Sequence, residues 1–77
     1  MSPLKRERHE MPDFIREALV GRDVLDAYLG RPAYQQNDYI GWITRAKRDS
    51  TREKRLQQML DELEHGGVYM RMKWRLK

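Results

Sequence analysis

Two stripes of apolar residues with helical spacing, separated by a short polar break at Asp49-Ser50, most constrain the fold of this chain. The stripes consist of Tyr39, Trp42, Ile43 and Ala46, and of Leu56, Met59, Leu60 and Leu63. At about 100° per residue, each set falls within a sector roughly 100° wide, which is the apolar face of an amphipathic helix. The sequence therefore predicts two packed helices joined by a tight connection, with Ile40 at the edge of the first apolar face.

The boundaries of these two helices follow from local signals. The third helix of the chain is expected from about residue 32 or 33 to residue 48. Ser50, followed three residues later by Glu53, fits a capping box that begins the fourth helix. The fourth helix is expected to continue to about His65, where the following pair of glycines ends it.

Two shorter helices are predicted upstream. Pro12 suits the first turn of a helix over about residues 12–20, which Gly21 would end. A second apolar pattern covers residues 23–29 and closes at Gly30. Helices this short depend on tertiary packing. With 77 residues and no cysteine, the chain is expected to form one all-α domain, a small bundle of three to four helices.

The two ends of the chain differ from this helical part. Residues 1–10 lack apolar periodicity and are predicted to be a flexible tail, so the helical domain covers residues 11–66. In the C-terminal tail, residues 67–77, cations alternate with the apolar residues Met70, Met72, Trp74 and Leu76. A period of two predicts extended backbone. Three placements are open: along the helices, against the edge of a partner's sheet, or mobile in solution.

Positive charge is concentrated in the second half of the chain. The formal net charge is +4, whereas residues 45–77 hold ten basic and five acidic residues, a net charge of +5. Such a surface favours nucleic acid, phosphorylated ligands, acidic proteins or a membrane surface, and the alternative is a solvated helix face of mixed charge. No segment is apolar enough to span a membrane, and the first ten residues are too polar for a secretory signal, so a cytoplasmic location is expected.

Arg52 is the sharpest candidate for a functional residue, because it falls within the apolar stripe of the fourth helix, where an unpaired charge is costly to bury. It also lies in the first helical turn, where unbonded backbone amides and the helix dipole favour an anion. Lys47 and Arg55 lie at the edges of the two apolar faces. Lys47, Arg52, Arg55 and the backbone amides near Ser50 and Thr51 are therefore predicted to ring one anion.

A structural role for Arg52 is the alternative. Pairing with Asp49, with Asp38 or with the carbonyl groups that end the third helix would clamp the connection between the two helices. Tyr39 and Trp42 likewise admit two roles, as core residues or as an aromatic platform for a ligand.

Residues suited to catalysis or metal binding are sparse. No base is placed beside Thr51, which is interpreted as a helix-start residue and not as a nucleophile. His9 lies in a polar tail, His65 lies at a helix end and cysteine is absent, so neither a metal nor a cofactor is predicted. The acidic residues of the fourth helix are interpreted as a solvated face, namely Asp61, Glu62 and Glu64. No enzymatic activity is expected.

A longer motif connects these residues. Tyr39-x-x-Trp42-Ile43-x-x-Ala46-Lys47, followed by Thr51-Arg52-x-x-Arg55, resembles the bacteriocin-protection, YdeI/OmpD-associated family. The similarity includes Met11-Pro12-Asp13-Phe14 and spans roughly residues 11–66. It implies a small all-helical bacterial domain with a link to bacteriocin tolerance and an outer-membrane porin. The chain has Ser50 where the family usually has glutamate, and the tail from Val68 onward lies outside the family pattern.

Two binding functions compete, and an enzyme is the less favoured third. The first is an interaction module, linked to bacteriocin tolerance or a stress response, that binds an unknown protein or anionic ligand through residues 47–55. The second is nucleic-acid binding through the start of the fourth helix and the C-terminal tail. The candidate tail contacts are Arg71, Lys73, Trp74 and Arg75. Truncation after Gly67 is expected to spare the first site and to remove the second. The sequence does not indicate an oligomeric state.

Overall fold

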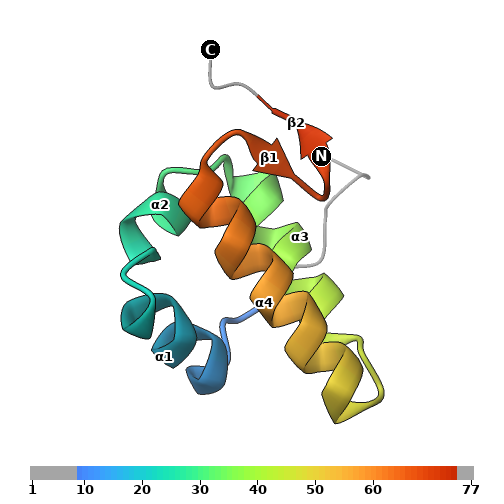
Figure 1. Ribbon diagram of the computed structural model, residues 1–77. Coiled ribbons are helices and arrows are strands. Elements are labelled where there is room, and N and C mark those ends of the chain that lie inside the picture. The colour runs from blue at the N-terminus through green and yellow to red at the C-terminus, as the bar shows by residue number, and fades with distance from the viewer. Residues whose placement is uncertain (1–8, 75–77) are drawn as a thin grey trace, which may run out of the picture.

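A computed structural model describes residues 9–74 and confirms a small all-α domain (Figure 1). Its helices are α1 (Asp13–Gly21), α2 (Leu25–Leu29), α3 (Ala33–Thr44) and α4 (Asp49–His65). A short antiparallel hairpin follows, formed by β1 (Val68–Tyr69) and β2 (Met72–Lys73). Residues 1–8 and 75–77 lie outside the described range, and with them most of the predicted N-terminal tail and Arg75.

Helix α4 is the longest element, and the other elements pack around it. Helices α1 and α2 lie on one flank of α4, α3 lies along the other, and the hairpin sits over its C-terminal end (Figure 1). The core consists of Ile15, Leu19, Val24, Tyr28, Tyr39, Ile40, Ile43, Leu56, Met59, Leu60 and Leu63. Burying each of the larger side chains contributes roughly 1.5–3 kcal/mol. Both predicted stripes are therefore buried, except that Trp42 is only half-buried at the edge of the core.

Helix α3 ends earlier than predicted, at Thr44 and not at residue 48. The Thr44 hydroxyl donates to the carbonyl of Ile40 at 2.8 Å, and the Ala46 N–H bonds to the carbonyl only three residues back, at 3.3 Å. This tighter final turn leaves the α-helical path. Ala46 is nonetheless buried, because the chain folds back toward α4 immediately after the helix. Ile40, predicted at the edge of the apolar face, is fully buried.

The predicted capping box at the start of α4 is wrong. The helix begins at Asp49, its N-cap is Arg48, and no side chain caps it. This early start places Ser50 inside the first turn, where its backbone is already helical, and Glu53 instead accepts a hydrogen bond from Gln57 at 2.8 Å. The carboxylate of Asp49 supplies the negative charge that favours the N-terminal end of a helix. The C-terminal end is as predicted, with Gly66 in the left-handed conformation at φ 88°.

The C-terminal tail lies along the helices as far as residue 74, the first of the three placements considered. It is extended in two short strands but turns back on itself, pairing Val68 with Lys73 and Tyr69 with Met72. The turn residues Met70 and Arg71 have φ values of 51° and 66°. Two consecutive left-handed residues are typical of a type I′ hairpin turn, which usually contains Asn or Gly. A turn built from Met and Arg therefore needs support from the rest of the domain.

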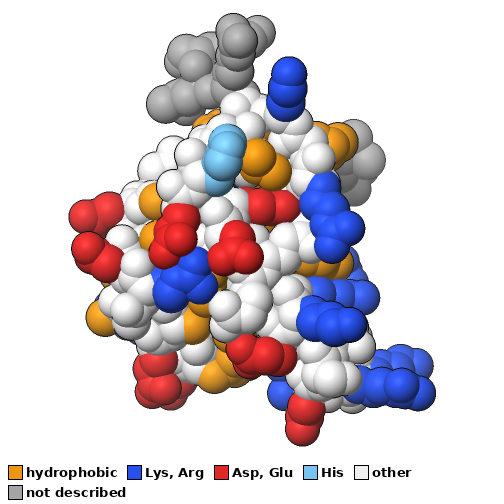
Figure 2. All heavy atoms as spheres, viewed as in Figure 1, with side chains coloured by type: hydrophobic (Ala, Val, Ile, Leu, Met, Phe, Trp, Pro, Cys, Tyr) orange, Lys and Arg blue, Asp and Glu red, His pale blue; other side chains and the backbone are white. Residues whose placement is uncertain are grey.

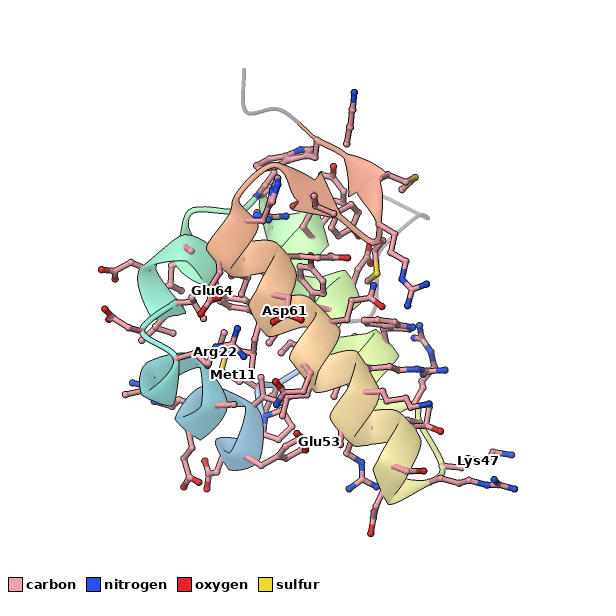
Figure 3. The ribbon with its side chains drawn as sticks, in the orientation of Figure 1. Met11, Arg22, Lys47, Glu53, Asp61 and Glu64 are labelled. Atoms are coloured by element: carbon pink, nitrogen blue, oxygen red, sulfur yellow. The ribbon has the colours of Figure 1, made fainter. Side chains whose placement is uncertain are left out.

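Arg22, which caps the C-terminal end of α1, joins α1 to α4 (Figure 3). Its guanidinium group bonds to Asp61 Oδ1 at 2.9 Å and to Glu64 Oε2 at 2.9 Å. The hydrogen bond from Arg22 lowers the pKa of Glu64 below its ordinary value of 4.5. Because both carboxylates are exposed and Arg22 is only half-buried, this contact orients α1 more than it stabilises the domain.

The Arg22 contact predicts a specific dependence of stability on pH. A carboxylate with a lowered folded-state pKa stabilises the fold above its unfolded-state pKa, and the stabilisation is lost as the pH falls through the lowered value. Arg22→Gln should therefore have a lower free energy of unfolding than the parent chain at pH 7. The difference between the two chains should be smaller at about pH 3. Urea unfolding at both pH values measures this difference. A difference that grows in acid would contradict the assigned contact.

Candidate functional site

The five predicted anion-binding residues occupy one end of the molecule but do not converge on one point. Lys47 lies in the α3–α4 connection, is exposed and extends away from the body of the domain (Figure 3). Ser50 is also exposed, whereas Thr51, Arg52 and Arg55 are half-buried. Thr51 and Arg55 lie on one face of α4, and Arg52 lies on another, toward α1. The five side chains therefore do not share one set of surroundings.

Arg52 faces α1. Its guanidinium group pairs with Asp49 Oδ1 at 3.3 Å and lies 5.9 Å from the centre of the Phe14 ring. One of the structural roles considered for Arg52, pairing with Asp49, thus has the required geometry. The Arg52 side chain is 37 % exposed, so little of its charge is removed from water. Exposed pairs of this spacing contribute about 0.3–0.5 kcal/mol.

Arg55, and not Arg52, contacts the end of α3. Arg55 Nη1 donates to the carbonyl of Trp42 at 2.7 Å, and the guanidinium carbon lies 5.4 Å from the Trp42 ring centre. This carbonyl belongs to the last turn of α3, where carbonyl groups lack helical partners. Arg55 therefore caps α3 and covers the indole by a cation–π contact. Trp42 is thus a boundary residue, with the core on one side and Arg55 on the other.

A groove of about 730 Å³ runs along α4 beside Trp42. It is lined by Trp42, Thr51, Glu53, Lys54, Arg55, Gln57, Gln58, Asp61, Glu62 and Arg71. The groove brings together three of the predicted site residues, Thr51 and Arg55 from α4 and Arg71 from the hairpin turn. Arg71 reaches α4 directly, since its Nε donates to Gln58 Oε1 at 3.1 Å. The groove therefore joins the motif region to the C-terminal tail.

The other described tail residues lie outside this groove. Lys73 is exposed on β2, and Trp74 lies over the buried Arg31, with 4.6 Å between the guanidinium carbon and the ring centre. Arg31 also donates to the carbonyls of Glu62 at 3.1 Å and Val68 at 2.8 Å. Trp74 thus helps to dock the hairpin on the helices.

Glu62 is the residue whose role the sequence did not reveal. It was predicted on a solvated face, but it is only 6 % exposed. Oε1 accepts hydrogen bonds from the Tyr39 hydroxyl at 2.5 Å and the Met70 N–H at 2.8 Å. Oε2 accepts from the Arg71 N–H at 2.9 Å and from Gln58 at 3.0 Å. The carboxylate therefore holds both left-handed residues of the hairpin turn.

Tyr39 completes this buried group, which we name the Glu62 network: Arg31, Tyr39, Glu62, Met70 and Arg71. Burial, followed by the hydrogen bond to Glu62, raises the pKa of Tyr39 above its ordinary value. The hydroxyl group consequently remains a donor to the carboxylate. Within residues 9–74, every buried side-chain nitrogen and oxygen atom has a hydrogen-bond partner.

Charge is unevenly distributed over the surface. Figure 2 shows Lys and Arg side chains along the edge formed by the α3–α4 connection and the hairpin, whereas most Asp and Glu side chains lie over α1, α2 and the middle of this face. Glu64 and Asp61, both on α4, face α1, where Arg22 pairs with them (Figure 3). The basic residues of the α3–α4 connection are thus separated from the acidic side of the domain.

The two histidines have structural contacts. The His9 N–H donates to Asn37 Oδ1 at 2.8 Å, and the His9 ring lies against Gly41, where an added Cβ atom would come within 2.7 Å of Nε2. His65 ends α4 and accepts a hydrogen bond from the Gly67 N–H at 3.2 Å. In the described part of the chain, no group of three or more His, Cys, Asp or Glu residues is arranged to hold a metal ion. No helix in this part is both long and apolar enough to cross a membrane.

Comparison with known proteins agrees with the motif. The family described as bacteriocin-protection, YdeI or OmpD-associated matches residues 8–66. The match covers 59 of the 77 residues, includes all four helices and ends at Gly66, two residues before the first strand of the hairpin. No curated protein and no solved structure matches the chain. On the strength of the match over its whole helical part, the chain belongs to the bacteriocin-protection, YdeI or OmpD-associated family.

Proposed function

We propose that this chain is a non-enzymatic binding module that recognises an anionic partner through its basic corner, defined as residues 45–55. The corner holds six basic and two acidic residues. Of the two carboxylates, Asp49 is paired with Arg52 and Glu53 accepts a hydrogen bond from Gln57. A surface with this excess of positive charge attracts anionic partners and accelerates their association.

The observation that carries the proposal is that three cations in the corner are exposed and have no ion-pair partner among the described residues. Lys47, Arg48 and Lys54 are all exposed. Within residues 9–74 none of them takes part in an ion pair, whereas Arg22 and Arg52 do. Cations that the domain itself leaves uncompensated are available to a partner. The family's link to bacteriocin protection is consistent with a role in tolerance exercised through such binding.

The proposal assigns no chemical step to the chain. The buried carboxylate of Glu62 already accepts four hydrogen bonds, so it has no capacity left for a substrate. The exposed Asp61 and Glu64 share Arg22. Binding is therefore the function that the described side chains support best.

Nucleic-acid binding is the second candidate, and one observation favours it. Arg71 of the C-terminal tail reaches the α4 groove, so the tail and the helix contribute to one surface. Two features count against it. Trp74 has one face against Arg31, and Glu53 and Asp61 line the groove, where phosphates would be repelled.

The proposal is tested with Lys47→Glu and a control that changes the net charge equally, Arg16→Glu on the exposed face of α1. Poly-glutamate, titrated into the labelled full chain at about 50 mM salt, should shift the backbone amide NMR signals of residues 45–55. Lys47→Glu should weaken this binding about fivefold and Arg16→Glu by much less, because only the former lies at the site. Unshifted corner amides, or equal weakening by the two variants, would overturn the proposal.

A further inference from the structure

The groove along α4 has the length of a short peptide segment. Its α4 lining contains one helical face, made of Thr51, Lys54, Arg55, Gln58 and Glu62. At about 1.5 Å per residue, the distance along the axis from Thr51 to Glu62 is roughly 16 Å. An extended peptide of about five residues covers this length at about 3.3 Å per residue. Trp42 lies beside this face near its N-terminal end, and Arg71 contacts Gln58 farther along.

Three cations and three carboxylates line the groove, and they differ in how the domain itself engages them. Asp61 pairs with Arg22 at 2.9 Å, Glu62 is buried and accepts four hydrogen bonds, and Glu53 accepts one hydrogen bond from the neutral amide of Gln57. The cations are not neutralised: Arg55 donates to a backbone carbonyl and Arg71 to a glutamine amide, both uncharged acceptors. In the described residues no ion pair includes Arg55, Arg71 or Lys54. These three cations are therefore available to the carboxylates of a partner.

The arrangement of these charges distinguishes a peptide from a nucleic acid strand. A nucleic acid carries a negative charge at every nucleotide, so a strand in this groove would place phosphates beside Glu53 and Asp61. A peptide carries carboxylates only at some positions and can place them opposite the cations. The amide side chains of Gln57 and Gln58 and the partly exposed Trp42 ring also suit peptide groups and an apolar side chain.

We infer that the α4 groove binds a short acidic segment of a partner protein, with carboxylates at Lys54, Arg55 and Arg71 and an apolar side chain beside Trp42. The groove assignment rests on the proposed binding function and adds to it the site and the chemical class of the partner. It also gives Arg71 and the hairpin turn a part in recognition, because the Glu62 network fixes the backbone from which Arg71 projects.

The test is a selection from a displayed library of random peptides of about twelve residues on the immobilised full chain, long enough to fill the groove. Peptides with several Asp or Glu residues and an apolar residue should be enriched. A fluorescent copy of the best peptide should bind Lys54→Glu and Arg71→Glu about tenfold more weakly than the parent chain, and Arg16→Glu nearly as well as the parent. Circular dichroism confirms that each variant is folded.

Three outcomes overturn the inference. The first is enrichment of peptides without acidic residues, or no enrichment. The second is a single-stranded thymidine oligonucleotide that binds more tightly than the best peptide at the same salt concentration, which would assign the groove to nucleic acid. The third is weakening by Lys47→Glu but not by Lys54→Glu or Arg71→Glu. That last result would retain the basic corner as the binding surface and remove the groove.

Discussion

Deletion of residues 68–77 is expected to unfold the helical domain or to destabilise it by at least about 4 kcal/mol, although the family match ends at Gly66. The deletion removes two of the four donors to the buried Glu62 carboxylate, the N–H groups of Met70 and Arg71. It also removes the Val68 carbonyl and the Trp74 ring from the buried Arg31 guanidinium. Two buried charged groups would then keep only part of their hydrogen bonds, and each of the three hydrogen bonds lost to a charged group costs about 1.5–3 kcal/mol.

Such a loss is large against the roughly 5–15 kcal/mol by which domains are stable. Urea unfolding, followed by circular dichroism at 222 nm, measures the free energy of unfolding of the deleted chain. Truncation after Trp74 is the matched control, since it leaves the contacts of Val68, Met70, Arg71 and Trp74 in place. If the two truncated chains unfold at the same urea concentration, the hairpin does not stabilise the helices.

This expected loss changes how truncation experiments are interpreted. From the sequence, removal of everything after Gly67 should spare a site in the motif region and abolish one in the tail. The structure shows that the same truncation removes two hydrogen bonds to α4 itself, through Glu62. Lost binding would then reflect a disturbed α4 as much as a missing tail. Single substitutions such as Lys54→Glu and Arg71→Glu separate the two causes.

Most of the helical framework was predictable because local periodicity determines it. The stripe ending at Leu63 is buried throughout. Gly66 ends α4 as predicted, because glycine readily adopts the positive φ that a helix end requires. The errors concern features decided by tertiary contacts. Helix α3 ends four residues early, and the capping box at Ser50 does not form because the N-cap of α4 is Arg48, two residues before Ser50.

The role of Glu62 was not predictable from helical phase. Counting about 100° per residue, Glu62 lies roughly 60° outside the apolar stripe of α4, whereas Glu64 lies only about 40° outside it. Helical periodicity therefore predicts that Glu64 is more buried than Glu62. In the structure Glu64 is exposed and Glu62 is buried. The hairpin covers Glu62, and its turn at Met70-Arg71 contains none of the residues that signal such a turn.

The candidate site was predictable in its location but not in its contacts. Phase correctly placed cations around the break between the two long helices. It did not determine which neighbours these cations meet. Arg55 contacts the Trp42 carbonyl of α3, whereas Arg52 lies beside Phe14 of α1. The hairpin turn brings Arg71 to the groove, where it contacts Gln58. The residues of this turn, Met70 and Arg71, are not ones that predict a turn from sequence.

The Glu62→Gln variant tests the buried carboxylate without changing its size. It is expected to lower the free energy of unfolding by about 2–4 kcal/mol. Each oxygen of Glu62 accepts from one backbone N–H and one side-chain donor, Met70 and Tyr39 on Oε1 and Arg71 and Gln58 on Oε2. A glutamine NH₂ at either place would face a fixed N–H donor of the turn. The Tyr39 hydroxyl or the Gln58 side chain can rotate away, but the backbone cannot.

The matched control is Glu64→Gln, because Glu64 lies on the same helix and loses the same charge but is exposed and bound only by Arg22. It should change the unfolding free energy much less than Glu62→Gln does. Amide hydrogen exchange adds a local measurement: in Glu62→Gln, the exchange of Met70 or Arg71 should accelerate more than that of the α4 core. If both variants lose equal stability, the left-handed turn does not depend on the carboxylate. If only Glu62→Gln is destabilised and its turn amides exchange faster, one buried side chain couples the core of the family domain to the hairpin that extends it.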